Sequence, residues 1–144
     1  SRIARCAAAF DGGGVSGDSA SAIALNGNAT IEDCSANDGG GIYVYTGGTV
    51  TLTGDSRIAR CAAGLFGGGV SGDSASAIAL HGSATIEGCS ANEGGGIFVT
   101  TGGSVTLTGD SRIARCAAAF DGGGVLGYRA TVVIRHAASV TYNR

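Results

Sequence analysis

The chain has 144 residues, a formal net charge of −2 and 44% hydrophobic residues, which suits one folded domain with a core. Its 28 glycines stand beside no Pro, Met or Trp, and its charged residues are scattered. These features exclude a basic run that binds nucleic acid, and no apolar stretch approaches the ~20 residues of a membrane-spanning helix. Because Met is absent, we expect a processed chain, a fragment or a segment of a longer polypeptide.

The chain repeats itself. Residues 1–55 match residues 56–110 at 45 of 55 positions, and residues 111–125 restart the unit as "SRIARCAAAFDGGGV". Each unit has two related halves of 28 and 27 residues, which share I-x-x-C-x-A, a glycine triplet, and then V or I. Repetition at this period is typical of solenoids. It predicts one domain, 1–144, with turns at 1–28, 29–55, 56–83, 84–110 and 111–137, and with 138–144 as the start of a sixth turn, a cap or a junction.

Three groups of apolar residues follow one another in each half-repeat. The first surrounds the Ile of I-x-x-C-x-A, the second is the V or I after the triplet, and the third is "SAIAL" or "TVTLT". Their period-2 alternation between Gly, Asn and Asp predicts short strands. No partner lies at hairpin distance, so we expect each strand to pair with its copy one turn away. The predicted fold is all-β, a parallel β-helix (β-solenoid) of about five turns with three short strands per turn.

In such a coil, equivalent residues stack at about 4.8 Å, like upon like. We expect a core ladder made of Cys6, Cys34, Cys61, Cys89, Cys116, Ile3, Ile31, Ile58, Ile86 and Ile113. The cysteine spacing matches no zinc pattern. Neighbouring cysteines would lie within disulfide range, so an unpaired buried ladder and at least one bridge both remain open.

The glycine triplets also recur once per half-repeat. A phosphate-binding loop would need a following helix and usually a Lys, and the chain has neither a helical pattern nor any Lys. We therefore expect tight corners that need positive φ and close backbone approach. The corner glycines are Gly12, Gly13, Gly14, Gly39, Gly40, Gly41, Gly67, Gly68, Gly69, Gly94, Gly95, Gly96, Gly122, Gly123 and Gly124.

Acidic residues precede four of the triplets: Asp11, Asp38, Glu93 and Asp121, with Phe66 interrupting the row. Such a row could bind calcium or perform acid–base chemistry on polysaccharides. These acids repeat with the scaffold, however, whereas a catalytic site would be a local departure from it. We therefore expect no enzyme activity, no catalytic or metal site and no cofactor.

The remaining polar positions have scaffold interpretations. A column of alternating charge is predicted at Arg5, Asp33, Arg60, Gly88 and Arg115, where opposite signs on adjacent turns favour the register. Rows resembling those of ice-binding solenoids occur only on alternate turns, at Thr51, Thr53, Thr106 and Thr108. His81 and His136 are expected in turns, and Asn28 begins a possible N-glycosylation sequon.

"CSANDGGGI" followed by "TLTGD" resembles the repeats of polymorphic outer-membrane-protein type, which carry GGA[ILV] and FxxN motifs. The resemblance implies a right-handed parallel β-helix in a large surface protein. It is the basis for the expected handedness.

These patterns favour a structural, extracellular or cell-surface solenoid. We expect it to build a filament or fibrous surface protein by stacking uncapped ends, on a second copy or on neighbouring turns of a longer chain. The alternative is an adhesin or glycan-binding module that uses one face, with Tyr43, Tyr45 and Phe98 available for stacking on sugars. A polysaccharide lyase or hydrolase and an ice-binding protein are less favoured. No nucleic-acid partner and no membrane insertion are expected.

Overall fold

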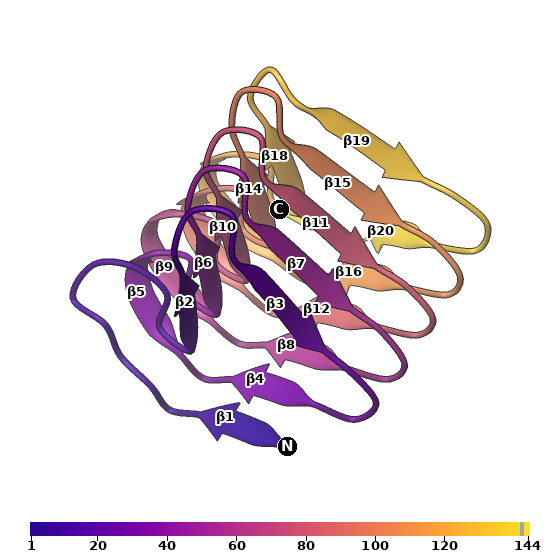
Figure 1. The fold of residues 1–144 in the computed structure, drawn as a ribbon, viewed down its shortest axis with the longest axis horizontal. Coiled ribbons are helices and arrows are strands. Elements are labelled where there is room, and N and C mark those ends of the chain that lie inside the picture. The colour runs from indigo at the N-terminus through magenta and orange to yellow at the C-terminus, as the bar shows by residue number, and fades with distance from the viewer. Residues whose placement is uncertain (142) are drawn as a thin grey trace.

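The computed structural model describes residues 1–141 and 143–144. The described residues form strands, turns and bends without a helix, and the strands line up in four parallel sheets. The chain coils so that each strand pairs with its copy one turn away, which makes a parallel β-solenoid of about five turns (Figure 1). The two termini lie at opposite ends of the coil.

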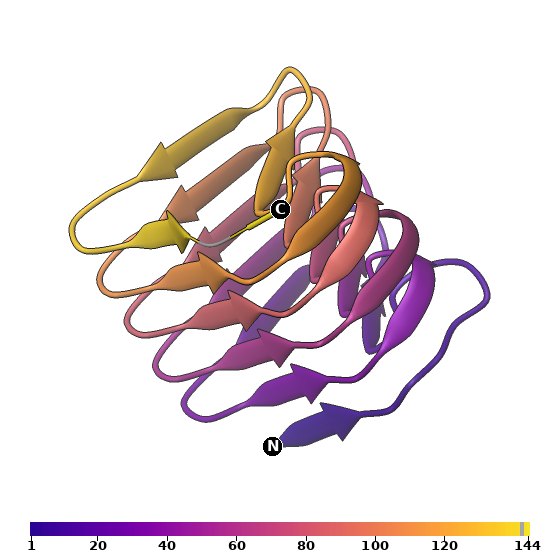
Figure 2. The same ribbon diagram turned by 180° about the vertical axis from the view of Figure 1, so that it is seen from behind.

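Sheet A contains the strands that carry I-x-x-C-x-A and has six members (Figure 2). The stacked residues are in register, with Ile3 opposite Ile31 and Ile113 opposite Val140. In stacking order the strands are β1 (Arg2–Ala4), β4 (Thr30–Glu32), β8 (Arg57–Ala59), β12 (Thr85–Glu87), β16 (Arg112–Ala114) and β20 (Ser139–Thr141).

Sheet B is shorter and follows the cysteines. Its members are β5 (Ser35–Asp38), β9 (Ala62–Phe66), β13 (Ser90–Glu93) and β17 (Ala117–Asp121). In the first turn, only isolated bridges at Ala7 and Asp11 continue this sheet. The register shifts within each pair of strands, because β9 and β17 have five residues where β5 and β13 have four. The extra residue of each 28-residue half-repeat is therefore a β-bulge in sheet B.

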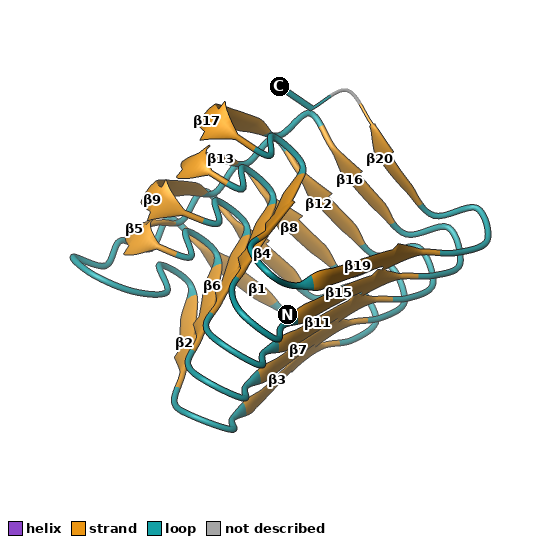
Figure 3. Ribbon diagram, turned by 90° about the horizontal axis from the view of Figure 1, so that it is seen from above, coloured by secondary structure: helices purple, strands orange, loops and turns teal. Residues whose placement is uncertain are grey.

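Sheets C and D complete the turn (Figure 3). Sheet C follows the glycine triplets and contains β2 (Val15–Gly17), β6 (Ile42–Val44), β10 (Val70–Gly72), β14 (Ile97–Val99) and β18 (Val125–Gly127). Sheet D contains β3 (Ala22–Leu25), β7 (Thr49–Leu52), β11 (Ala77–Leu80), β15 (Ser104–Leu107) and β19 (Thr131–Ile134).

A complete turn thus has four strands, and the expectation of three per turn was wrong. Four corners bend the chain, and each has a column of residues with positive φ. Two of these columns are mostly glycine, and the column between sheets C and D consists of Ala20, Gly47, Ala75, Gly102 and Arg129. The fourth, between sheets A and B, consists of Arg5, Asp33, Arg60, Gly88 and Arg115, with φ between 51° and 63°. This left-handed bend separates the sheet A strand from the sheet B strand that follows it.

The core is a set of apolar columns inside the coil. Ile58, Ile86 and Ile113 in sheet A are fully buried, as are Val50 and the other inward residues of sheets C and D in the middle turns. At about 25 cal/mol per Å² of buried apolar area, this continuous core is the main stabilising contribution. Neighbouring turns continue each column, because each turn alone is a single layer of chain.

Candidate functional site

The cysteine ladder lies inside the coil beside sheet A. Cys34, Cys61, Cys89 and Cys116 are buried, Cys6 is half-buried in the first turn, and all five are free thiols. Their Sγ atoms contact backbone carbonyls, as in the 3.4 Å contact from Cys61 Sγ to Ala59 O. Burial raises the pKa of the Cys34 thiol to about 11. The ladder as described is therefore unpaired, and its members act as small buried hydrophobic groups.

The glycine triplets form the corner between sheets B and C, and the third turn shows what each glycine does. Gly67 has φ of 62°. A Cβ on Gly68 would lie 2.3 Å from Ser90 O, and a Cβ on Gly69 would lie 2.7 Å from Ile86 Cγ2. The first glycine allows the left-handed bend, and the next two let adjacent turns approach closely. Backbone and side-chain atoms of the next turn therefore lie directly against the second and third glycines.

The acidic row lies at the end of sheet B. Asp11 bridges Asp38, and Glu93 pairs with Asp121. The Tyr45 hydroxyl donates a hydrogen bond to Asp11 Oδ2 at 2.8 Å. Burial, and then the charge of Asp11, raise the pKa of the Asp38 carboxyl. Among the described residues, no group of three or more His, Cys, Asp or Glu side chains is arranged to hold a metal ion.

The threonine rows are divided between two places: Thr51 and Thr106 lie in sheet D, and Thr53 and Thr108 follow it at the corner between sheets D and A. Thr53 Oγ1 donates to Asn26 Oδ1 at 2.7 Å, and Thr108 Oγ1 lies 2.6 Å from His81 Nδ1. Thr53 and Thr108 thus contact different residue types, Asn26 and His81, on the turn before them. His136 has φ of 62° at the same corner, and Asn28 is exposed in a turn.

A charged cluster covers the outer side of sheet A. Glu32 pairs with Arg2 and Arg60, and in the next 55-residue unit Glu87 pairs with Arg57 and Arg115. Hydrogen bonds from Arg2 and then Arg60 hold the pKa of the Glu32 carboxyl below its usual range. The column at the bend was predicted from the sequence, whereas these two glutamates were not. The signal was present, because arginines and a glutamate share one outward face at equivalent positions of both units.

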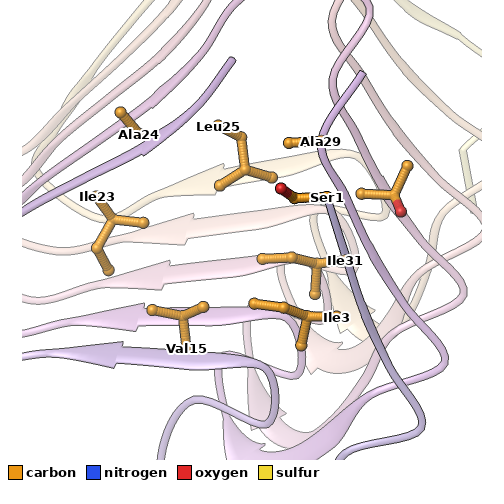
Figure 4. Close-up of a pocket in the computed structure, with 9 residues that line it drawn as sticks. Ser1, Ile3, Val15, Ile23, Ala24, Leu25, Ala29 and Ile31 are labelled. Atoms are coloured by element: carbon orange, nitrogen blue, oxygen red, sulfur yellow. The ribbon is translucent and has the colours of Figure 1, made fainter. Parts of the chain in front are cut away.

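The first turn leaves an apolar hollow of about 180 Å³ at the N-terminal end of the coil (Figure 4). Ile3 and Ile31 come from sheet A, Val15 from sheet C, and Ile23 and Leu25 from sheet D, and Figure 4 shows these side chains around one space. Ile3 is 36% exposed, whereas Ile31 one turn further in is 1% exposed. The hollow is the open end of the core.

The opposite end differs in composition. Val132 and Ile134 of β19 are 42% and 47% exposed. Asn143 follows β20 at the position where the cysteine ladder would continue. Its Oδ1 accepts a hydrogen bond from Cys116 N at 2.9 Å, and its Nδ2 donates to Ile113 O at 3.3 Å. Asn143 thus covers the last thiol with a polar group that satisfies the backbone beneath it.

Comparisons with known proteins add no relative: no protein-family model, curated protein or solved structure matches this chain. In the part of the chain that the structure describes, no helix is long and apolar enough to cross a membrane. The site features therefore rest on the geometry of the solenoid alone.

Proposed function

We propose that the chain is a structural element of an extracellular filament or fibrous surface protein, extended end to end by further solenoid turns. The observation that carries the proposal is the apolar hollow at the N-terminal end. Its large apolar lining residues are the inward residues of sheets A, C and D, the same positions that form the core in the middle turns. Apolar area buried there is worth about 25 cal/mol per Å². A second copy whose exposed Val132 and Ile134 face this hollow would bury apolar groups of both ends.

The last residues limit how two copies can meet. Arg112 pairs with Ser139 in sheet A, and Arg2 is equivalent to Arg112, so residues 1–7 and 138–144 correspond to the same part of a turn. A copy that continues the coil without a gap needs its residues 1–7 where residues 138–144 lie. End-to-end stacking therefore competes with the contacts of this C-terminal segment.

This competition defines the test. Sedimentation velocity and electron microscopy should show concentration-dependent rods for residues 1–144, and faster growth for a variant that ends at residue 137. Ile23→Lys places a charge in the hollow and should abolish growth. Thr51→Lys, on the outer face of sheet D, is the matched control and should leave growth unchanged. Monomers at all concentrations, for both the parent and the shortened variant, would refute stacking between copies.

A specific observation also favours the alternative, a glycan-binding face. The rings of Tyr43 and Tyr45 are 4.8 Å apart in an edge arrangement, and Tyr45 is 36% exposed beside Asp11. An exposed aromatic ring next to a carboxylate acceptor is suited to stacking on a sugar and to binding its hydroxyls. A glycan array with the parent chain and Tyr45→Ala tests this function, and equal signals from the two proteins would argue against it.

A further inference from the structure

The two 55-residue units differ at one position in the charged cluster, and the first unit shows what that position does. Asp33, at the bend after β4, accepts hydrogen bonds from Arg60 on the next turn. Arg60 Nε lies 2.8 Å from Asp33 Oδ1, and Arg60 Nη2 lies 3.0 Å from Oδ2. Arg60 Nη2 also contacts Glu32 Oε2 at 2.8 Å. The guanidinium thus binds Asp33 with two donors and shares one of them with Glu32.

In the second unit Gly88 replaces Asp33, so this carboxylate is missing. Arg115, which corresponds to Arg60, still donates from Nη2 to Glu87, which corresponds to Glu32. The backbone is the same in both units, with φ of 55° at Asp33 and 63° at Gly88. The position of the missing side chain is part of a pocket of about 210 Å³ lined by Arg57, Arg60, Glu87, Gly88 and Arg115.

We propose that this pocket binds a small oxyanion, a carboxylate, sulfate or phosphate group, which Arg115 holds as Arg60 holds Asp33. A planar guanidinium with two parallel N–H donors matches such oxyanions. The Arg115 donors that correspond to those of Arg60 face Gly88, so no aspartate occupies them. The ligand chemistry is set by the first unit, in which the Asp33 carboxylate occupies the equivalent place.

The charges around the pocket support an anion. Three arginines line it and only one acid, Glu87, whose two oxygens already contact Arg57 and Arg115. Arg57 adds positive charge to the wall of the pocket, and its side chain is partly exposed there.

The site offers a substitution that fills it from within. A Cβ built on Gly88 has Arg60 Cγ at 3.6 Å as its nearest neighbour, which is ordinary contact. Asp33 shows that an aspartate adopts the required left-handed backbone at this bend. Gly88→Asp should therefore fold and place its own carboxylate on Arg115. Gly88→Ala adds a side chain without a charge and is the matched control.

The test is isothermal titration calorimetry with inorganic sulfate, inorganic phosphate and acetate, each at constant ionic strength set by sodium chloride. We expect one saturable site per chain in the parent and in Gly88→Ala, and at least a tenfold lower affinity in Gly88→Asp. Asp33→Gly should open the equivalent place beside Arg60 and raise the stoichiometry to two. Circular dichroism of each variant checks that the fold is intact.

The outcomes separate the proposal from general ionic effects. Saturable binding that Gly88→Asp weakens, with a second site in Asp33→Gly, supports it. Equal binding to the parent and to folded Gly88→Asp, or no saturable binding to the parent, would overturn it. Glucuronate and a sulfated monosaccharide form a second arm, since tighter binding of these than of the free ions identifies a glycan as the source of the oxyanion. The site stands apart from end-to-end stacking, so failure of either proposal leaves the other unaffected.

Discussion

The same fifteen residues, "SRIARCAAAFDGGGV", occur at residues 1–15 and again at residues 111–125, near the two ends of the coil. Their structures differ. Ile3 is 36% exposed and Ile113 is fully buried. Residues 117–121 form β17, whereas their first copy joins its neighbour only through bridges at Ala7 and Asp11. Identical local sequence thus gives different burial and different strand content.

The contacts on either side explain the difference. Residues 111–125 lie between the fourth turn and the last residues of the chain, where Ala118 N donates to Arg144 O and Arg144 N to Cys116 O. Among the described residues, residues 1–15 form backbone pairs only with the second turn. In a solenoid, therefore, the neighbouring turns determine how much each residue contributes to stability.

The largest expected effect comes from the isoleucines that occupy the same place in the two copies. Ile113→Ala should lower the free energy of unfolding by about 2–5 kcal/mol, because it leaves a cavity between two turns. Ile3→Ala should cost less than about 1 kcal/mol, because Ile3 is partly exposed beside an open hollow. Urea denaturation followed by circular dichroism measures both. Equal losses would show that contacts on both sides are not what distinguishes the copies.

A smaller effect is expected where the C-terminal segment covers the second copy. Asn143→Ala removes both hydrogen bonds to the backbone around Cys116 and should cost about 1–3 kcal/mol, mainly because it leaves the Cys116 N–H without its acceptor. Asn28→Ala, an exposed asparagine in a turn, is the control and should change stability by less than about 0.5 kcal/mol. The same denaturation assay applies, and a loss in Asn143→Ala no larger than in the control would mean that this cover is dispensable.

Much of the fold could be predicted because the repetition is nearly exact. The stacked isoleucines and cysteines followed from the 27- and 28-residue spacing, since only in-register pairing places like residues together. The fourth strand of each turn could not be predicted as easily. Its corner has Arg5, Asp33 or Arg60 in the left-handed region instead of glycine. These residues rarely mark such a bend, so two strands appeared to be one.

The candidate sites were less predictable than the fold. The hollow exists because the first turn has a neighbour on one side only, a property of the assembled coil that no residue pattern expresses. The charged pocket depends on a single substitution, Gly88 for Asp33, which in the sequence looks like a gap in a row of charges. Only the contacts of Arg60 with Asp33 reveal what that gap leaves open.

In residues 1–15, Asp11 lies opposite a second acidic residue, Asp38 of the next turn. This pair gives a pH-dependent prediction. Asp38 lies opposite Asp11, its Oδ1 is buried without a partner among the described residues, and its pKa is raised by burial. A raised pKa in the folded state means that the ionised form destabilises the fold at pH 7, and that this penalty disappears as pH falls through the raised value. Like charges directly opposite cost up to about 1 kcal/mol.

Asp38→Asn should therefore raise the free energy of unfolding at pH 7 by a few tenths to about 1 kcal/mol. The difference from the parent should shrink as pH falls from the raised pKa toward 3.8, the ordinary value for aspartate. Denaturation curves between pH 3 and 7, a range of about four units around carboxyl titration, measure it. Asp18→Asn, at an exposed turn, is the control. A difference that grows at low pH would refute the expected sign.

The smallest effect is expected at an aromatic position that is exposed in both copies. Phe10 is 75% exposed and Phe120 is 72% exposed, because each is in a stretch between cysteine and glycine triplet that is one residue longer than in the alternate turns. The bulge turns this residue outward, so a turn on one side or on both makes no difference to it. Phe10→Ser and Phe120→Ser should each change the free energy of unfolding by less than about 0.5 kcal/mol, equally in urea denaturation. A loss at Phe120 alone would mean that the bulge is covered near the C-terminal end, and that its exposure, like that of Ile3, depends on the neighbouring turn.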